Sequence, residues 1–543
     1  MEKRLFLAIG LSFLVVWLWS AGAPKNPPLS LPPESTEAAG MRQDTKAGRQ
    51  GALPSISGNQ TENLARNEKV DEQVETLDSE KLNIEISNIG GALNKVMIKE
   101  YASSLPLRGI TSIAGYENVP FVLSKSSDGE IIFYFENSDI KIVKTYKINE
   151  NDYIVESNVD LYNNTDMSKL IDFNIQGYAI EMSNLNGNEE KLDRTQDRDK
   201  SLNEYVVNAE GGIYRKAGAF KFSQKEQKEE GGKVFWVGFR NRYFCALVKP
   251  QYETNGYAIT IVDDKRLKVE IKTPETTMPP KGSAHFNSII YVGPEKAEVL
   301  NGYGFGFEKI RKYYRFTLLD GIAMIIDSLM RTLHKIIPSW GACIILISVI
   351  IYFSMYPLTM KGMLSMKRMQ SLQPMIAKLK EKHKDNPQKM NKEMMELYKE
   401  HKVNPLGGCL PMLLQMPVFI GLYQVLWRSV AFKGAKFLWI KDLSEPDRLF
   451  IFPFNLPVVG NELNILPLIM VVVMFFQQKI SSKNMVISDP SQAAQQKMMT
   501  TIMPIFLGFI FYKFASGLTL YFTMFYFFST FTQWKMSKQV KVN

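Results

Sequence analysis

Five apolar segments fill the last third of this 543-residue chain and constrain its fold more than any other feature. They are Trp340–Leu358, Pro405–Trp427, Leu463–Phe476, Met498–Tyr512 and Phe514–Trp534. In lipid a backbone satisfies its hydrogen bonds only as a helix or a closed barrel, and a helix needs roughly 20 residues to cross about 30 Å of hydrocarbon. The first, second and fifth segments have that length, whereas the third and fourth are shorter. The sequence therefore predicts an integral membrane protein.

The composition requires a large water-soluble part beside these segments. With 22% charged residues and a mean hydropathy of −0.13, the chain is too polar to lie wholly in a membrane, so at least two domains are expected. The net charge of +10 has its local excess beside the apolar segments, which argues against nucleic acid as a partner. The three cysteines (Cys245, Cys343 and Cys409) are far apart, and the four histidines lack zinc-ligand spacing. We therefore expect no disulfide framework, no metal and no cofactor.

The N-terminus begins with a charged MEKR followed by a short apolar run. Small residues at 21–23 fit a signal-peptide cleavage site, but Pro24 would follow the cleaved bond directly. Trp17 and Trp19 also suit an anchor at the membrane interface. Between these alternatives we favour a retained first span over residues 1–21.

Residues 22–308 divide into a linker and a folded domain. Residues 22–75 are rich in Pro, Gly, Ser, Asn and charge, which predicts a flexible linker. From residue 76 to 308 apolar residues alternate with polar ones, as in the run that begins at Leu82, and polar turns separate many short runs. This pattern predicts an all-β sandwich outside the cytoplasm. It contains no motif with catalytic spacing.

Two further helical regions flank the first long apolar segment. Residues 309–338 have apolar residues at helical spacing, interrupted by charges such as Asp327 and Arg331, which predicts an amphipathic helix in the membrane interface. Residues 361–402 hold eleven Lys or Arg against five Asp or Glu. The pair Asn386-Pro387 predicts a helix start within that segment, and hence a basic helical hairpin. Its charge places the hairpin in the cytoplasm.

Several ordered motifs resemble those of the YidC membrane protein insertases. Between about residues 339 and 534 the similar strings are MYPLT (Met355–Thr359), LQP (Leu372–Pro374), EMMELYKEHKVNPLGGCLP (Glu393–Pro411), LLQMPVF (Leu413–Phe419) and SGLTLYF (Ser516–Phe522). VFWVGFRNRYFCALVKP (Val234–Pro250) and YVGPEKAEVL (Tyr291–Leu300) resemble parts of the periplasmic domain found in the Gram-negative form of this family. Agreement by chance over so many motifs in one order is negligible.

The resemblance implies six transmembrane helices, five of them forming the insertase core, and a periplasmic all-β supersandwich domain. Both termini would be cytoplasmic, in a bacterial inner membrane. The expected parts are a first span at 1–21, a linker at 22–75, the β-domain at 76–308, an interfacial helix at 309–338, a second span at 339–360, a cytoplasmic hairpin at 361–403, further spans at 404–430, 462–480, 498–514 and 515–535, and a cytoplasmic tail at 536–543.

The resemblance also implies a hydrophilic groove that opens to cytoplasm and lipid. Family members carry a positive residue in that groove, but the corresponding position here is Tyr352. Arg428 and Lys513 are the candidate compensating charges, although both lie toward the outer ends of their spans. The other groove and slide candidates are Ser348, Gln415, Phe419, Met470, Tyr521 and Phe522.

Each of these candidates also has a structural interpretation. Gln415 suits a hydrogen bond between helices as well as a groove lining, and Ser348 suits a bond to its own helix backbone as well as a substrate contact. Phe419, Met470, Tyr521 and Phe522 suit ordinary packing as well as an adaptable slide for varied substrates.

The sequence thus predicts a membrane protein insertase and chaperone for nascent membrane proteins, acting alone or with the Sec translocon. The basic hairpin suits either anionic lipid of the bilayer or the ribosome and its nascent chain. No small-molecule substrate and no enzyme activity are expected. The alternatives are a structural assembly scaffold and a small-solute transporter; the latter predicts internal repeats and paired ionisable residues at mid-membrane, which the sequence lacks.

Overall fold

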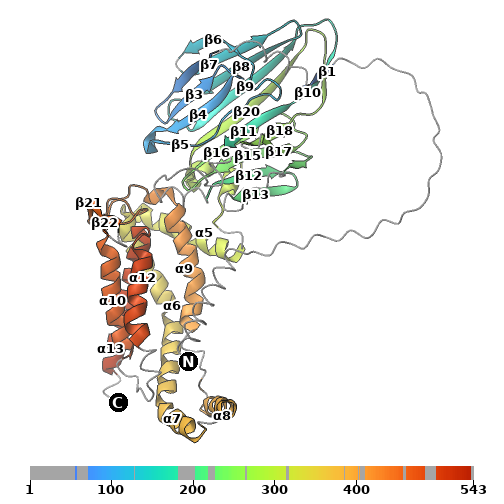
Figure 1. Cartoon of the computed structure of the whole chain (residues 1–543). Coiled ribbons are helices and arrows are strands. Elements are labelled where there is room, and N and C mark those ends of the chain that lie inside the picture. The colour runs from blue at the N-terminus through green and yellow to red at the C-terminus, as the bar shows by residue number, and fades with distance from the viewer. Residues whose placement is uncertain are drawn as a thin grey trace, which may run out of the picture. The chain divides into compact units, whose positions relative to one another are not determined.

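The computed structural model describes residues 55–57, 71–127, 129–181, 202–217, 227–262, 266–313, 317–383, 386–401, 403, 410–456, 460–482 and 497–539 (Figure 1). The expected first span at 1–21 and nearly all of the linker at 22–75 lie outside these residues, as do residues 540–543 of the tail.

A nine-stranded antiparallel sheet is the largest layer of the N-terminal half. Buried and more exposed residues alternate along its strand β8, where Ile140 and Ile142 are buried. This alternation is typical of a strand that packs one face on a core. In spatial order the sheet contains β13 (Gly212–Ala217), β12 (Glu204–Ala209), β15 (Val234–Arg240), β16 (Phe244–Pro250), β20 (Ser283–Pro294), β9 (Ile154–Asn163), β8 (Ile140–Ile148), β7 (Glu130–Glu136) and β6 (Val122–Ser127).

Smaller sheets accompany it. One has the order β11 (Asn174–Glu181), β18 (Arg266–Lys272), β17 (Tyr257–Val262) and β14 (Lys228–Glu230), and another has β2 (Val74–Asp78), β3 (Leu82–Ser87), β4 (Ala92–Ile98) and β5 (Ser103–Ser104). The 3-10 helix η2 (Lys99–Tyr101) connects β4 to β5. In the third, β10 (Lys169–Asp172) pairs with β19 (Thr276–Met278) and, in parallel, with β1 (Ser55–Ser57).

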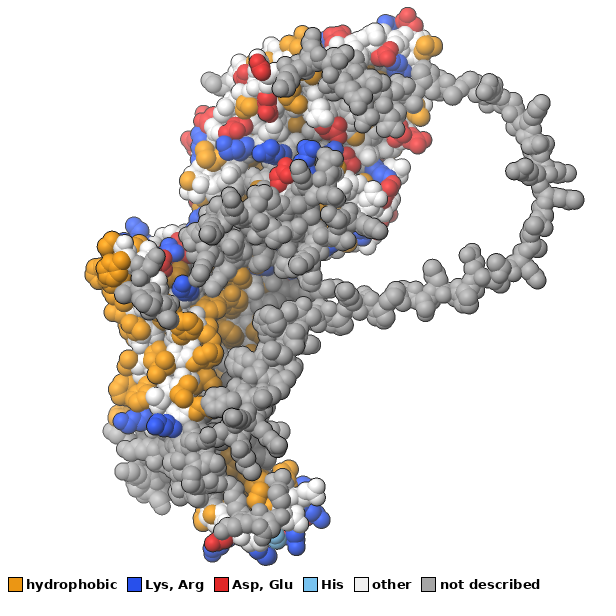
Figure 2. Space-filling model, viewed as in Figure 1, with side chains coloured by type: hydrophobic (Ala, Val, Ile, Leu, Met, Phe, Trp, Pro, Cys, Tyr) orange, Lys and Arg blue, Asp and Glu red, His pale blue; other side chains and the backbone are white. Residues whose placement is uncertain are grey.

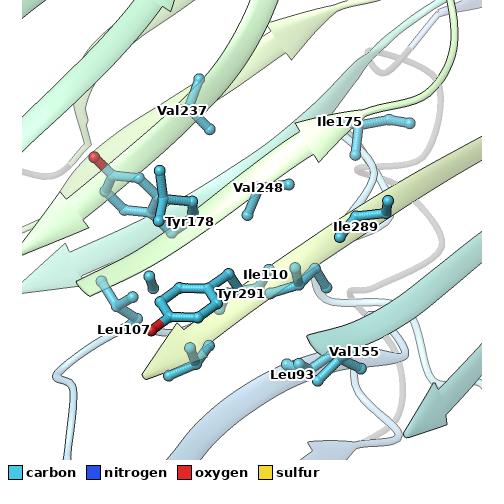
Figure 3. Close-up of a cluster of buried hydrophobic side chains, with 14 of the residues drawn as sticks. Leu93, Leu107, Ile110, Val155, Ile175, Tyr178, Val237, Val248, Ile289 and Tyr291 are labelled. Atoms are coloured by element: carbon cyan, nitrogen blue, oxygen red, sulfur yellow. The ribbon is translucent and has the colours of Figure 1, made fainter. Parts of the chain in front are cut away.

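Buried apolar side chains join these layers into one core (Figure 3). Val155 and Ile289 come from the nine-stranded sheet, while Leu93 and Ile175 come from the two four-stranded sheets. Packing between sheets of this kind defines a β-sandwich. The all-β architecture expected from the alternating pattern is confirmed.

Lys144 on β8 is fully buried in this domain. Its Nζ donates hydrogen bonds to the carbonyl oxygens of Gly90 at 2.7 Å and Thr111 at 2.9 Å. Burial lowers the pKa of this lysine from 10.5 to about 7, although the charge of Glu117 acts in the opposite direction. The Lys144 amine therefore connects β8 to the backbone at Gly90 and Thr111, away from water.

We predict that this lysine makes the β-domain more stable as the pH rises from about 7 toward 10. In that window the folded lysine loses its proton while the unfolded lysine keeps it, so the unfolded state binds more protons and stability increases with pH. Lys144→Met should reduce the slope of the unfolding free energy by on the order of 1 kcal/mol per pH unit. Hydrogen exchange of β8 and β9 amides, corrected for its intrinsic pH dependence, measures that slope. Lys147→Met, on the exposed face of β8, is the matched control; an unchanged slope in Lys144→Met would contradict the prediction.

The second face of β15 and β16 is covered by the segment that leads out of the β-domain. The short helices there are α4 (Ala297–Gly302) and η3 (Phe307–Ile310). A Cβ atom at Gly238 would lie 3.1 Å from Ile310 Cδ1, so the glycine permits a close approach. Both faces of β15 and β16 are therefore buried, which explains their nearly continuous burial pattern.

A polar junction follows at residues 309–313. Arg240 of β15 donates to the carbonyl oxygens of Ile310 at 3.2 Å and Lys312 at 2.8 Å. Arg311 and Arg331 both pair with Asp327, at 2.5 and 2.7 Å. The junction carbonyls thus accept hydrogen bonds from the β-domain, and Arg311 of the junction is paired with a carboxylate of α5.

The C-terminal half is mainly helical. Its helices are α5 (Thr317–Ile336), α6 (Trp340–Ser371), α7 (Gln373–Lys382), α8 (Pro387–Glu400), α9 (Leu410–Arg428), α10 (Ile465–Ser482), the π-helix η6 (Met498–Ile502), α12 (Met503–Phe511) and α13 (Ser516–Gln539). Among the described residues one helical stretch, Trp340–Gly362, is long and apolar enough to cross a membrane; Ile465–Ile480 and Thr500–Phe511 are apolar but shorter.

Two regions differ from the expected boundaries. Helix α6 does not end near residue 360 but continues to Ser371, so the second expected span and the start of the hairpin are one helix. The expected outer loop at 428–462 contains η5 (Val430–Phe432) and the two-stranded sheet of β21 (Phe450–Leu456) and β22 (Gly460–Leu463). Sequence spacing predicted neither of these features.

Helices α7 and α8 form the hairpin region. The Asn386 side chain accepts a hydrogen bond from the Lys389 backbone N–H at 3.1 Å, and Pro387 is the first helical residue. This is the cap that the Asn-Pro pair predicts. Leu372, Ile376 and Val403 form a small core there, separate from that of the other helices.

Candidate functional site

A polar contact joins α9 to α13 inside the helical bundle. Gln415 Nε2 donates a hydrogen bond to the Tyr521 hydroxyl oxygen at 2.8 Å. Tyr521 is fully buried, whereas Gln415 is partly exposed. Gln415 lies five residues after the start of α9 at Leu410 and thirteen before its end at Arg428, about 20 Å from that end. The two polar groups therefore meet in the second turn of α9.

Aromatic side chains surround this contact. The Phe419 ring, one turn along α9, lies 5.1 Å from that of Phe522 in an edge-to-face arrangement, and Phe522 lies 4.9 Å from Phe511 of α12. Four predicted residues, Gln415, Phe419, Tyr521 and Phe522, thus come together at the interface of α9 and α13.

Tyr352 reaches the same helix from α6. It is buried, and its ring lies 5.6 Å from that of Phe525, which in turn stacks on Tyr521 at 6.1 Å. The position at which the family resemblance implies a positive residue is therefore filled by an aromatic ring packed on α13. It joins the site through Phe525 rather than by direct contact with Gln415.

The remaining predicted residues lie elsewhere. Ser348 is buried, and its hydroxyl donates to the Ile344 carbonyl of its own helix at 2.6 Å. Met470 on α10 is buried in the apolar core of the bundle. Neither side chain presents an open surface in this structure.

Arg428 ends α9 and Lys513 lies in the turn between α12 and α13, whereas Tyr352 lies within α6. Arg428, the last residue of α9, donates to the Lys312 carbonyl of the junction at 3.1 Å. Lys513 follows α12 and, with Arg242 of the β-domain and Glu445, lines a small cavity. The structure therefore does not bring either charge to the predicted groove.

Polar residues that the sequence analysis did not select also enter the bundle. Thr519, Thr523 and Ser529 on α13 are buried; the signal for the first two was a four-residue spacing of polar residues within an apolar helix. The hydroxyl of Thr523, for example, donates to the Thr519 carbonyl at 2.7 Å. Among the described residues, three buried glutamine oxygens have no hydrogen-bond partner: those of Gln424, Gln477 and Gln533.

The outer surface of the bundle is apolar. Figure 2 shows hydrophobic side chains over the region of α10 and α13, whereas the β-domain surface carries mixed charges. Exposed residues include Val472 of α10 and Ile505 and Phe509 of α12. An apolar surface of this extent on a helical bundle indicates contact with lipid.

Nowhere in the described ranges do three His, Cys, Asp or Glu side chains gather closely enough to hold a metal ion.

Together, an all-β domain and a helical bundle with an apolar exterior define a membrane protein with a large extramembrane domain. Family comparison makes this specific. The family model described as 60Kd inner membrane protein matches residues 332–543, and that of the YidC periplasmic domain matches residues 117–322. The chain belongs to the YidC membrane protein insertase family.

Curated relatives carry the same family name. The membrane protein insertase YidC of Chlorobaculum tepidum is 30% identical over 497 residues, which cover 86% of this chain and 82% of the relative. That of Pelobacter propionicus is 30% identical over 570 residues, covering 96% of both chains. A solved structure of an active YidC insertase is 18% identical with a TM-score of 0.36, over 85% of this chain and 94% of that one.

We predict that the contact between Gln415 and Tyr521 stabilises the bundle by about 0.5–1 kcal/mol, the usual value for a hydrogen bond between membrane helices. Gln415→Leu and Tyr521→Phe should each lower the unfolding free energy, and the double variant should cost less than the sum of the two. Thermal or denaturant unfolding in detergent provides the double-mutant cycle. Gln415→Leu combined with Thr530→Val is the control, because the Thr530 hydroxyl bonds within α13; additivity in both pairs would refute the coupling.

Proposed function

We propose that this protein inserts nascent membrane proteins into the lipid bilayer, and that the polar contact of Gln415 with Tyr521 marks the path of the substrate's polar groups. The observation that carries this proposal is the contact itself, set in a bundle whose core and exterior are otherwise largely apolar. The unpartnered oxygens of Gln424, Gln477 and Gln533 support it, because buried polar groups normally find a partner, water included.

The physical task is to lower a transfer barrier. An unsatisfied backbone group in hydrocarbon costs several kcal/mol, so a polar segment crosses lipid slowly by itself. Hydroxyl and amide groups inside the bundle offer that segment hydrogen bonds on the way. The apolar part of the substrate then gains about 25 cal/mol per Å² of surface that leaves water. No covalent step is needed.

The bundle supplies hydrogen-bonding groups rather than a net charge at this depth. Tyr352 occupies the position of the family's positive residue, whereas Arg428 lies at the end of α9 and Lys513 in the turn between α12 and α13. A hydrophilic groove in this protein therefore depends on neutral hydroxyl and amide groups. Phe419 and Phe522 border the polar contact and would hold apolar substrate segments.

The wider arrangement follows from this proposal. We place the β-domain in the periplasm and both termini in the cytoplasm, with six spans in a bacterial inner membrane. The basic hairpin of α7 and α8 would face the ribosome or the anionic lipid surface, and the Sec translocon would be a partner for larger substrates. The protein would also act as a chaperone that helps its substrates to fold and assemble.

Photo-crosslinking tests the path of the substrate. A photoreactive residue in place of Phe419 or Met416 should capture a stalled nascent membrane protein, since both side chains lie on α9 beside Gln415 and are at least partly exposed. Val472 on the exterior of α10 is the matched control within the bundle, and Val122 on β6 is the control in the β-domain; both are more than half exposed, at 54% and 55%. Equal capture at all four positions would contradict the proposed path and favour a structural scaffold.

A second test replaces Tyr352 by arginine. If neutral polar groups suffice, liposomes that contain this protein alone should insert a small substrate at a rate that Tyr352→Arg does not raise. Gln415→Leu should lower that rate several-fold, because it removes the hydrogen-bonding group while leaving the packing volume similar. Insertion is measured by protease protection of the translocated end. A large gain from Tyr352→Arg would show that the absent charge limits the reaction.

A further inference from the structure

A basic cavity of about 260 Å³ lies where the β-domain, α5 and the end of α9 meet. Its lining includes the side chains of Arg311, Arg331, His334, Lys335, Trp340 and Arg428. Arg311 belongs to the polar junction, the next three residues belong to α5, Trp340 begins α6 and Arg428 ends α9. Cationic side chains from elements far apart in the sequence thus line the same cavity.

The carboxylates of this cavity are already engaged. Glu295 is held by Arg240 at 2.8 Å, and Glu298 pairs with Arg331 at 3.1 Å. Among the described residues, no ion pair involves Arg428 or Lys335. The cavity therefore retains positive charge that the described part of the protein does not neutralise.

Three buried nitrogen atoms of the lining lack a hydrogen-bond partner among the described residues. They are Arg311 Nε, Arg428 Nε and His334 Nδ1. Leaving a buried donor unpaired costs about 1–3 kcal/mol, more if the group is charged. An anion with several acceptor oxygens would satisfy such nitrogens together and balance the charge.

The surroundings favour a lipid as the source of that anion. On α5 the side chains of Leu318, Ile325 and Ile336 are 74%, 69% and 76% exposed, which is typical of a helix that lies on a membrane. Trp340 lines the cavity at the first residue of α6, the apolar span, and tryptophan is enriched at the level of the headgroups. The cavity would therefore lie where phosphates of the outer leaflet are found.

We propose that this cavity binds the phosphate group of an acidic phospholipid, with Arg311, Arg428 and His334 as its hydrogen-bonding side chains. The bound phosphate would connect the β-domain junction to α5 and α9. The site is distinct from the Gln415–Tyr521 contact, so it does not depend on the proposed substrate path.

Native mass spectrometry of the full chain, delipidated in detergent, tests this site. Phosphatidylglycerol is added in one arm, phosphatidylcholine in a second and inorganic phosphate in a third. The wild-type protein should bind phosphatidylglycerol in preference to phosphatidylcholine, and Arg428→Gln should weaken that binding about tenfold or more, as the loss of a charge-assisted hydrogen bond implies. Lys441→Gln, an exposed lysine outside the cavity, should bind like the wild type.

Two controls distinguish a loss of binding from a loss of folding. Arg428→Lys keeps the positive charge and should recover part of the affinity, and the unfolding temperature without ligand shows whether each variant is folded. Binding of inorganic phosphate that Arg428→Gln abolishes, without preference for phosphatidylglycerol, would assign the same site to free phosphate. Equal binding of phosphatidylglycerol by wild type, Arg428→Gln and Lys441→Gln, or no binding in any arm, would overturn the proposal.

Discussion

The backbone of residues 309–313 is the constraint on which the two halves of the described structure depend. Arg215 and Arg240 of the β-domain donate to the Ile310 carbonyl, and Arg428 of α9 donates to that of Lys312. The chain leaves the 3-10 helix η3 at Ile310, and without these donors its carbonyl oxygens would be buried without partners. Arginine suits this position because its planar group carries five donors and keeps its charge when buried. A second contact supports the junction, since Arg242 donates to the Trp427 carbonyl at the end of α9 at 2.8 Å.

Inside the bundle, buried polar groups find their hydrogen-bond partners among neutral groups. Hydroxyls on α6 and α13 bond to carbonyls of their own helices, and Gln415 bonds across to Tyr521. A hydroxyl that donates in this way still has acceptor capacity of its own. The bundle therefore holds polar groups without the desolvation cost of a buried ion. Tyr352 fits this pattern, because its ring packs on α13 where a charge would need a partner.

Local pattern predicted much of the fold. Alternation indicated the all-β domain, and the Asn386-Pro387 pair indicated where α8 begins, because both signals depend on neighbouring residues alone. The burial of Lys144 could not be predicted, because its partners Gly90 and Thr111 come from other parts of the chain. The strands β21 and β22 were also missed: Pro453 and Pro457 interrupt a run that otherwise resembles a strand.

The sequence predicted which residues belong to the candidate site, but not how their side chains are oriented. Similar motifs selected Gln415, Phe419, Tyr521 and Phe522, which the structure brings together. Nothing in the sequence indicates that Met470 faces the core of the bundle, because orientation around a helix that is apolar on every side leaves no periodic signal. The basic cavity was missed because its side chains come from four separate segments of the chain.

The length of α6 has a mechanical consequence. As one helix from Trp340 to Ser371 it extends about 48 Å, more than the hydrocarbon thickness of a bilayer. Its last turns, after the apolar stretch Trp340–Gly362, therefore extend beyond the hydrocarbon layer, and a force on them acts through the same helix on the buried turns around Ser348. Pro357, which lacks a backbone N–H, is the point at which such a rod bends most easily.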